Sequence, residues 1–265
     1  MKAAPLAVLA LAATISSAPA TTPAETCGWP NPVQRRVLEQ ATRLMPSSLA
    51  RILKRHEQAV GRGAEAQRKL RPALPHAQGV EPGGGTAERL AASLARITAL
   101  IDSHAPLKRV AWEFGAASHL ITDLSNPFRT APRDEDAALF EDRFLVYLSE
   151  HLPHLRVVFT TYQDPLLERG QTVEFGLQLA ARSRSYLDDL VGAFRRFETS
   201  GDPSLLDERS IPFGVASLSY SRSVMDTARV WLHAWRQAHG DLTDLPFPLT
   251  RPDTAGSPTG TKGRP

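Results

Sequence analysis

One histidine and one aspartate, His119 and Asp123, stand four positions apart in the largely apolar stretch WEFGAASHLITDLSNPFRT, residues 112–130. On an α-helix, side chains at i and i+4 share a face and lie about 5–6 Å apart. An imidazole nitrogen and a carboxylate oxygen so placed are ligands that zinc accepts, provided that another segment completes the shell. The alternative is a buried histidine whose ring is satisfied by the carboxylate one turn later. The spacing leaves both interpretations open.

The stretch that carries this pair is predicted to be a helix that begins near Leu107. Proline at position 127 ends it, because proline disfavours helical geometry in the residue before it. Apolar residues at three- and four-residue steps, together with cap and breaker residues, predict the other helices. They cover 33–45, Ser47 or Ser48 to about Gly61, 86–104 with Thr86 as its cap, 134–151, most of 166–197 with bends at Gly170 and Gly176, and 211–239.

Two other segments are predicted to lack helical structure. Residues 70–85 are dense in proline and glycine and are typical of a long surface loop. Residues 155–162 read LRVVFTTY, a short β-branched run without partner strands, which we interpret as an extended connector. The predicted fold class is therefore all-α, a single-domain multi-helix bundle.

The 265 residues, 42% of them hydrophobic, suffice for one sizeable core. Residues 1–20 carry Lys2, an apolar run and Ala18-Pro19-Ala20, a pattern typical of a cleaved signal peptide, so we expect export to the periplasm or medium. We then expect a flexible segment at 21–32, the helical domain at 33–245 and a polar disordered tail at 246–265.

Charge and motif content exclude several functional classes. Removal of residues 1–20 lowers the formal charge from +3 to +2, too little to indicate nucleic-acid binding by bulk charge. No apolar run reaches the roughly 18 residues of a membrane-spanning helix. The single cysteine, Cys27, cannot form an internal disulfide. Nucleophile-elbow, Walker, HExxH and CxxC motifs are absent from the sequence, and nothing in it indicates an oligomeric state.

The segment FGAASHLITDLSNPF resembles LGxAxHYxxDxxQPxH of the zinc-dependent phospholipase C and P1/S1 nuclease family. It shares the small residues before His119, the spacing to Asp123, and Pro127. A looser likeness extends over most of residues 29–240. The resemblance implies an all-helical, exported hydrolase that cleaves phosphodiester or related bonds at a trinuclear zinc site, with phospholipid or another phosphoester as substrate.

The resemblance also implies metal-ligand positions. His119 and Asp123 stand where the family has two zinc ligands, Glu141 stands at a carboxylate ligand of the next helix, and His76 could supply a further histidine. These four donors are enough for one zinc ion and too few for three.

Four family positions carry other residues. Arg129 and Ala137 each stand where the family has a histidine, and Gln34 stands where its first helix supplies one. Arg68 is the nearest counterpart of an aspartate that the family has after its second helix. Arg129 could hold a phosphate oxygen of a substrate in place of a metal. It could equally repel a divalent ion and form a salt bridge with Asp123.

Three functional hypotheses follow from these residues. The first is a zinc-dependent phosphoester hydrolase that retains one ion. The second is a catalytically silent relative that binds a lipid, a phosphorylated ligand or an envelope partner in the same cleft. The third is an exported helical scaffold in which the His119–Asp123 pair is purely structural.

Overall fold

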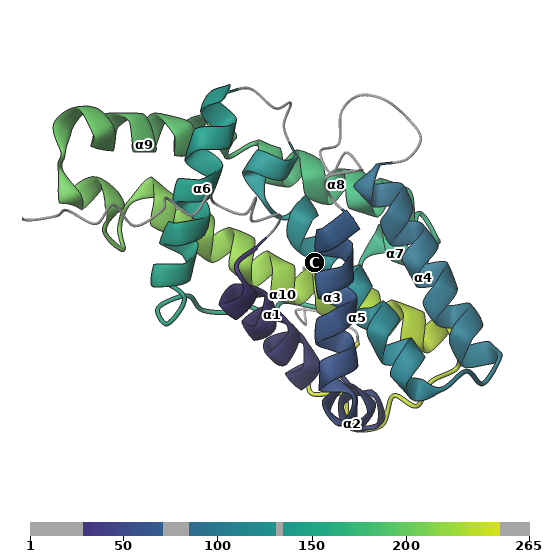
Figure 1. The fold of residues 1–265 in the computed structure, drawn as a ribbon. Coiled ribbons are helices and arrows are strands. Elements are labelled where there is room, and N and C mark those ends of the chain that lie inside the picture. The colour runs from purple at the N-terminus through teal and green to yellow at the C-terminus, as the bar shows by residue number, and fades with distance from the viewer. Residues whose placement is uncertain (1–28, 71–84, 131–134, 250–265) are drawn as a thin grey trace, which may run out of the picture.

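The computed structural model describes residues 29–70, 85–130 and 135–249. These residues form helices joined by turns and irregular segments, with no strand, so the predicted all-α class is confirmed (Figure 1). The helices are α1 (Asn31–Arg43), α2 (Ser47–Arg55), α3 (Glu57–Leu70), α4 (Thr86–Asp102), α5 (Leu107–Leu124), η2 (Pro127–Arg129), α6 (Glu135–Glu150), α7 (Pro165–Glu168), α8 (Thr172–Arg184), α9 (Leu187–Ser200), η3 (Pro203–Leu206) and α10 (Ile211–Gln237).

Several predicted helix boundaries need correction. The helix expected from Ser47 to about Gly61 is interrupted at His56, which has φ −116° and ψ 29°, and the chain continues as α3 beyond Gly61. Gly85 occupies the N-cap of α4, and Thr86 is the first helical residue instead of the cap.

The segment 166–197 is broken at one of the two glycines expected to bend it. Gly170 follows α7 with φ 72°, a left-handed conformation that glycine adopts without steric cost. Gly176 stays inside α8, and the second break falls after that helix, at Ser185 and Tyr186. The connector at 155–162 is irregular, as predicted.

Helix α5 is the centre of the bundle. All of its residues from Val110 to Leu124 except Trp112 are buried, so the helix is enclosed on nearly every side. Helices α3, α4, α8 and α10 pack around it. The indole nitrogen of Trp231 in α10 donates a hydrogen bond to the carbonyl of Phe114 in α5, with 2.9 Å between nitrogen and oxygen.

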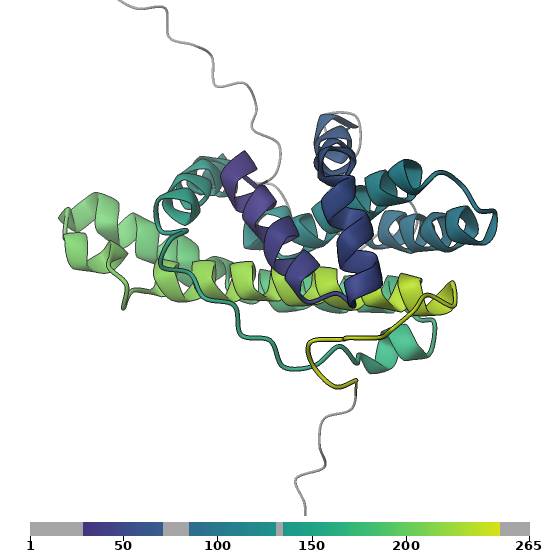
Figure 2. The same cartoon turned by 90° about the horizontal axis from the view of Figure 1, so that it is seen from below.

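Helix α10 runs along the length of the molecule and separates two layers (Figure 2). Helices α1 to α3 lie on one side of it, and the connector after α6 and the segment after α10 lie on the other. Side chains of α10 hold that connector: the Ser221 hydroxyl accepts from the Val158 amide at 2.8 Å, and Arg229 donates to the Thr161 carbonyl at 3.0 Å.

The domain limits of 33 and 245 remain a prediction. Packing begins earlier than predicted, because the indole of Trp29 is 1% exposed. The first residues of the expected tail, 246–249, are described, and the rings of Phe247 and Phe159 lie 4.9 Å apart. The predicted signal peptide, Cys27, most of the 70–85 loop with His76, and residues 250–265 lie outside the described residues. No helix within the described ranges has the length and hydropathy to cross a membrane.

Candidate functional site

His119 and Asp123 meet inside α5 as their spacing predicts. The imidazole Nε2 lies 3.4 Å from a carboxylate oxygen of Asp123, and both side chains are almost completely buried. Removal of an ionised carboxylate from water is costly unless a partner or a cation stabilises it. The site around Asp123 must therefore contain balancing charge or hydrogen-bond donors.

Arg89 of α4 supplies a positive charge near this carboxylate. Burial lowers the pKa of the Arg89 guanidinium, and the charge of Asp123 acts in the opposite direction, favouring the charged form. The guanidinium also donates to the Thr86 hydroxyl at 3.2 Å. Sequence reasoning missed Arg89, because a helix-surface arginine gives no sign of which neighbouring helix it will face.

Glu141 is paired with Arg129. The carbonyl oxygen of the Asn126 side chain accepts a hydrogen bond from the Phe128 amide at 3.0 Å, which starts η2 directly after α5. This short helix brings the Arg129 guanidinium into an ion pair with the carboxylate of Glu141 in α6. The two side chains are only 5% and 6% exposed. From the sequence, Asp123 was a possible salt-bridge partner of Arg129. In the structure Arg129 instead forms its ion pair with Glu141.

Gln34 joins α1 to α5 beside His119. Its amide nitrogen donates to the Ser118 hydroxyl at 3.1 Å, and its amide oxygen accepts from the Thr122 hydroxyl at 2.9 Å. All three side chains are buried. The position at which the resemblance calls for a histidine ligand is thus occupied by a neutral side chain that binds two hydroxyls of α5.

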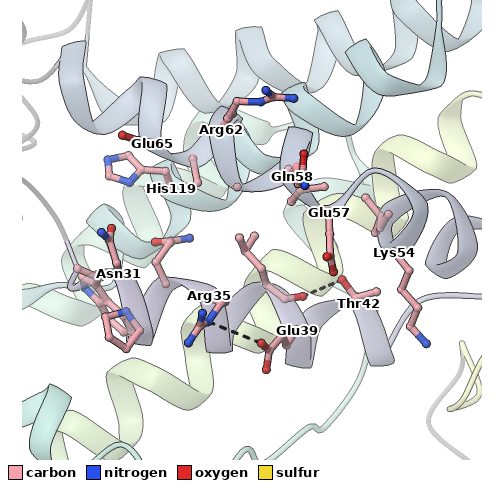
Figure 3. Close-up of a pocket in the computed structure, with 18 of the residues that line it drawn as sticks. Asn31, Arg35, Glu39, Thr42, Lys54, Glu57, Gln58, Arg62, Glu65 and His119 are labelled. Carbon is pink, nitrogen blue, oxygen red and sulfur yellow. Dashed lines mark hydrogen bonds and ion pairs between the residues drawn. The ribbon is translucent and has the colours of Figure 1, made fainter.

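A groove of about 1210 Å³ opens between α1 on one side and α2 and α3 on the other, and His119 lines it. His119, Asn31 and Glu65 lie at one end, and Thr42 and Lys54 lie at the other (Figure 3). The basic residues along it are Arg35, Arg43, Lys54 and Arg62, and the acidic ones are Glu39, Glu57 and Glu65. Its apolar lining includes Leu38, Leu53, Val60 and Ala64.

The predicted ligand positions do not come together as a metal centre within the described residues. Across 29–70, 85–130 and 135–249, no three histidine, cysteine, aspartate or glutamate side chains are grouped so that they could hold a metal ion. His119 and Asp123 contribute two donors, Glu141 is engaged by Arg129, and Gln34 binds hydroxyls. Because Zn²⁺ in proteins takes at least three protein ligands, this donor set does not fit the trinuclear centre that the resemblance implies.

No known family model and no curated protein matches this sequence. The fold is similar to that of a crystal structure of Clostridium perfringens alpha-toxin from the avian strain SWCP, with a TM-score of 0.54 and 11% sequence identity. The match covers 79% of this chain and 64% of the toxin chain, so this chain spans less than two thirds of the length of that protein. A likeness at this level of identity shows a common helical fold.

Proposed function

We propose that this chain is a non-hydrolytic protein with the phospholipase C-like helical fold, and that it binds a phospholipid in the groove between α1 and α3. The observation that carries the proposal is the groove itself, about 1210 Å³ in volume, with His119 in its lining. Such a volume is slightly above the range of typical small-molecule sites, roughly 300–1,000 Å³. A phospholipid headgroup with part of its chains is of suitable size.

The lining of the groove fits an amphipathic, zwitterionic ligand. Leu38, Leu53 and Val60 offer apolar contact area. Arg62 and Glu65 in the lining offer one charge of each sign, which is the pattern that a phosphate and an ammonium group in one headgroup require. Export, as residues 1–20 predict, would place this groove at the cell envelope, where phospholipid is abundant.

The proposal that hydrolysis is lost rests on the residues at the family's ligand positions. Gln34 and Ala137 have no side chain that binds zinc strongly, and Glu141 is held by Arg129. A multi-metal phosphodiesterase needs each ion held firmly to orient the attacking water and stabilise the leaving oxygen. The side chains described here supply no such set of ligands.

Calorimetry with a short-chain phosphatidylcholine, kept below its micelle concentration, tests the proposed binding site. Gly61 lines the groove, and a Cβ built on it meets nothing within 4 Å, so Gly61→Trp fills the groove without an initial clash. Gly214 in α10 is equally open and lies outside the groove, so Gly214→Trp is the matched control. We expect Gly61→Trp to weaken binding about tenfold or more, which is roughly 1.4 kcal/mol. Absence of binding to the wild type, or equal binding by both variants, would contradict the proposal.

A second candidate is a one-zinc phosphoester hydrolase. It has His119, Asp123 and Glu141 as ligands, His76 as a further donor and Arg129 as the substrate-phosphate contact. The approach of the imidazole to the carboxylate at 3.4 Å, together with the position of His119 in the groove lining, favours it. It requires that purified protein contain zinc and cleave bis(p-nitrophenyl) phosphate, and that chelator and His119→Ala abolish both properties. A metal-free, inactive protein would eliminate this candidate.

A further inference from the structure

We infer that an arginine side chain takes the place of a metal in the interior of this protein: Arg129 is the built-in cation for Glu141. This inference rests on the proposed loss of the metal centre and is independent of what the groove binds.

The pair of Arg129 and Glu141 carries the inference. An ion pair at this depth is retained only if the attraction and hydrogen bonds compensate for removing both charges from water. The planar guanidinium can do so, because its donors match the geometry of a carboxylate and it is more weakly hydrated than an ammonium group. Arg129 therefore gives Glu141 the positive partner that a metal would otherwise supply.

The charge of Arg129 opposes the binding of a divalent ion at Glu141. The two side chains form a buried ion pair, and an added cation would be repelled by the guanidinium unless that side chain moved out. The ion pair also ties η2 and α6 together at the exit of α5.

The test measures thermal stability of the full chain, with zinc or with EDTA. The wild type is expected to melt at the same temperature in both and to carry no stoichiometric zinc after purification. A zinc-dependent rise in the melting temperature, or zinc that copurifies and is lost in His119→Ala, would overturn the inference.

A cycle of substitutions separates a charge partner from a packing residue. Arg129→Met keeps most of the side-chain length but leaves Glu141 as an unpaired buried carboxylate, so we expect the melting temperature to fall by roughly 10 °C. Arg129→Met combined with Glu141→Gln removes both charges and is expected to regain at least half of that loss. If Arg129→Met does not fold, the melting temperature of Glu141→Gln is compared with that of the double variant. The two temperatures should then differ little, because the arginine has no buried charge to balance once Glu141 is neutral. A double variant no more stable than Arg129→Met, or markedly less stable than Glu141→Gln, would contradict the assignment.

The control is an ion pair of similar composition on the surface. Arg35 and Glu39 in α1 lie 3.9 Å apart with side chains 78% and 47% exposed. Arg35→Met is expected to change the melting temperature by no more than about 3 °C, because exposed pairs contribute little. These experiments measure thermal stability, whereas the lipid-binding proposal is tested by calorimetry. A failure to bind lipid would therefore not change the melting temperatures, and unexpected melting temperatures would not change the measured lipid binding.

Discussion

A Cβ atom built on Gly115 in α5 would lie 1.8 Å from the carbonyl oxygen of Val60 in α3, so the two backbones are in direct contact. Gly63 of α3 makes the reciprocal approach, because a Cβ there would lie 1.8 Å from the carbonyl oxygen of Trp112. Because neither glycine has a side chain, α3, which forms one side of the groove, can lie directly against α5. His119 follows Gly115 by one turn, and this contact therefore places it at the groove.

Gly115→Ala is expected to destabilise the protein by about 3 kcal/mol or more. The methyl group meets backbone atoms, which cannot rotate away, and over-packing of a core costs roughly 1–3 kcal/mol even where side chains can adjust. Urea denaturation followed by circular dichroism measures the loss. Gly214→Ala is the control, with an expected gain of about 0.5–1 kcal/mol in free energy of unfolding, because its Cβ meets open space and alanine favours the helix. Equal stability of Gly115→Ala and wild type would show that the helices can separate at no cost.

Gln34→Leu is expected to lower the free energy of unfolding by about 1–2 kcal/mol. The leucine fills similar volume but removes one donor and one acceptor from the buried hydroxyls of Ser118 and Thr122. In a double-mutant cycle with Thr122→Val, the second substitution should cost less in the Gln34→Leu background than in the wild type. Additive costs would show that the contact between the two side chains contributes nothing to stability.

Asp226→Ala is expected to destabilise the protein by about 3–5 kcal/mol. Asp226 is completely buried between Arg182, 2.6 Å away, and Arg229, 3.0 Å away, so its removal leaves a buried guanidinium without its counter-charge. Since Arg229 also binds the carbonyl of Thr161, loosening of the connector should accompany the loss and increase amide exchange at 155–162. Asp189→Ala, at an exposed position in α9, should stay within about 0.5 kcal/mol of wild type.

Alkaline pH is expected to destabilise the fold partly through Tyr162. Burial raises the pKa of this phenol to about 12, and its hydroxyl donates to the carbonyl of Leu44. In the unfolded chain the phenol loses its proton near pH 10. Between pH 10 and 12 the folded state therefore holds the proton more tightly, and the free energy of unfolding falls as pH rises.

Tyr162→Phe removes this group from the titration. Above pH 10 the free energy of unfolding of the variant should fall less steeply than that of the wild type, and the two slopes should differ by up to about 1.4 kcal/mol per pH unit. Below pH 9 the two curves should run parallel. Guanidinium denaturation at several pH values measures both slopes. Parallel curves above pH 10 would show that Tyr162 ionises equally in both states.

The sequence determined most of the secondary structure. Apolar periodicity placed α1, α4, α5, α6 and α10 within a few residues of their observed bounds, because each helix buries one stripe or its whole circumference. The breaks at His56 and Tyr186 were missed. Neither histidine nor tyrosine is a helix breaker, so the local sequence does not mark these breaks.

Local spacing also determined that His119 and Asp123 would meet, since a helix fixes the i to i+4 distance regardless of the rest of the fold. The tertiary structure decided the longer-range partners: Glu141 for Arg129, and two hydroxyls for Gln34. These residues are separated by many positions and come from different helices. The backbone contact at Gly63 and Gly115 and the path of η2 bring such helices together, and pair spacing in the sequence contains no information about either.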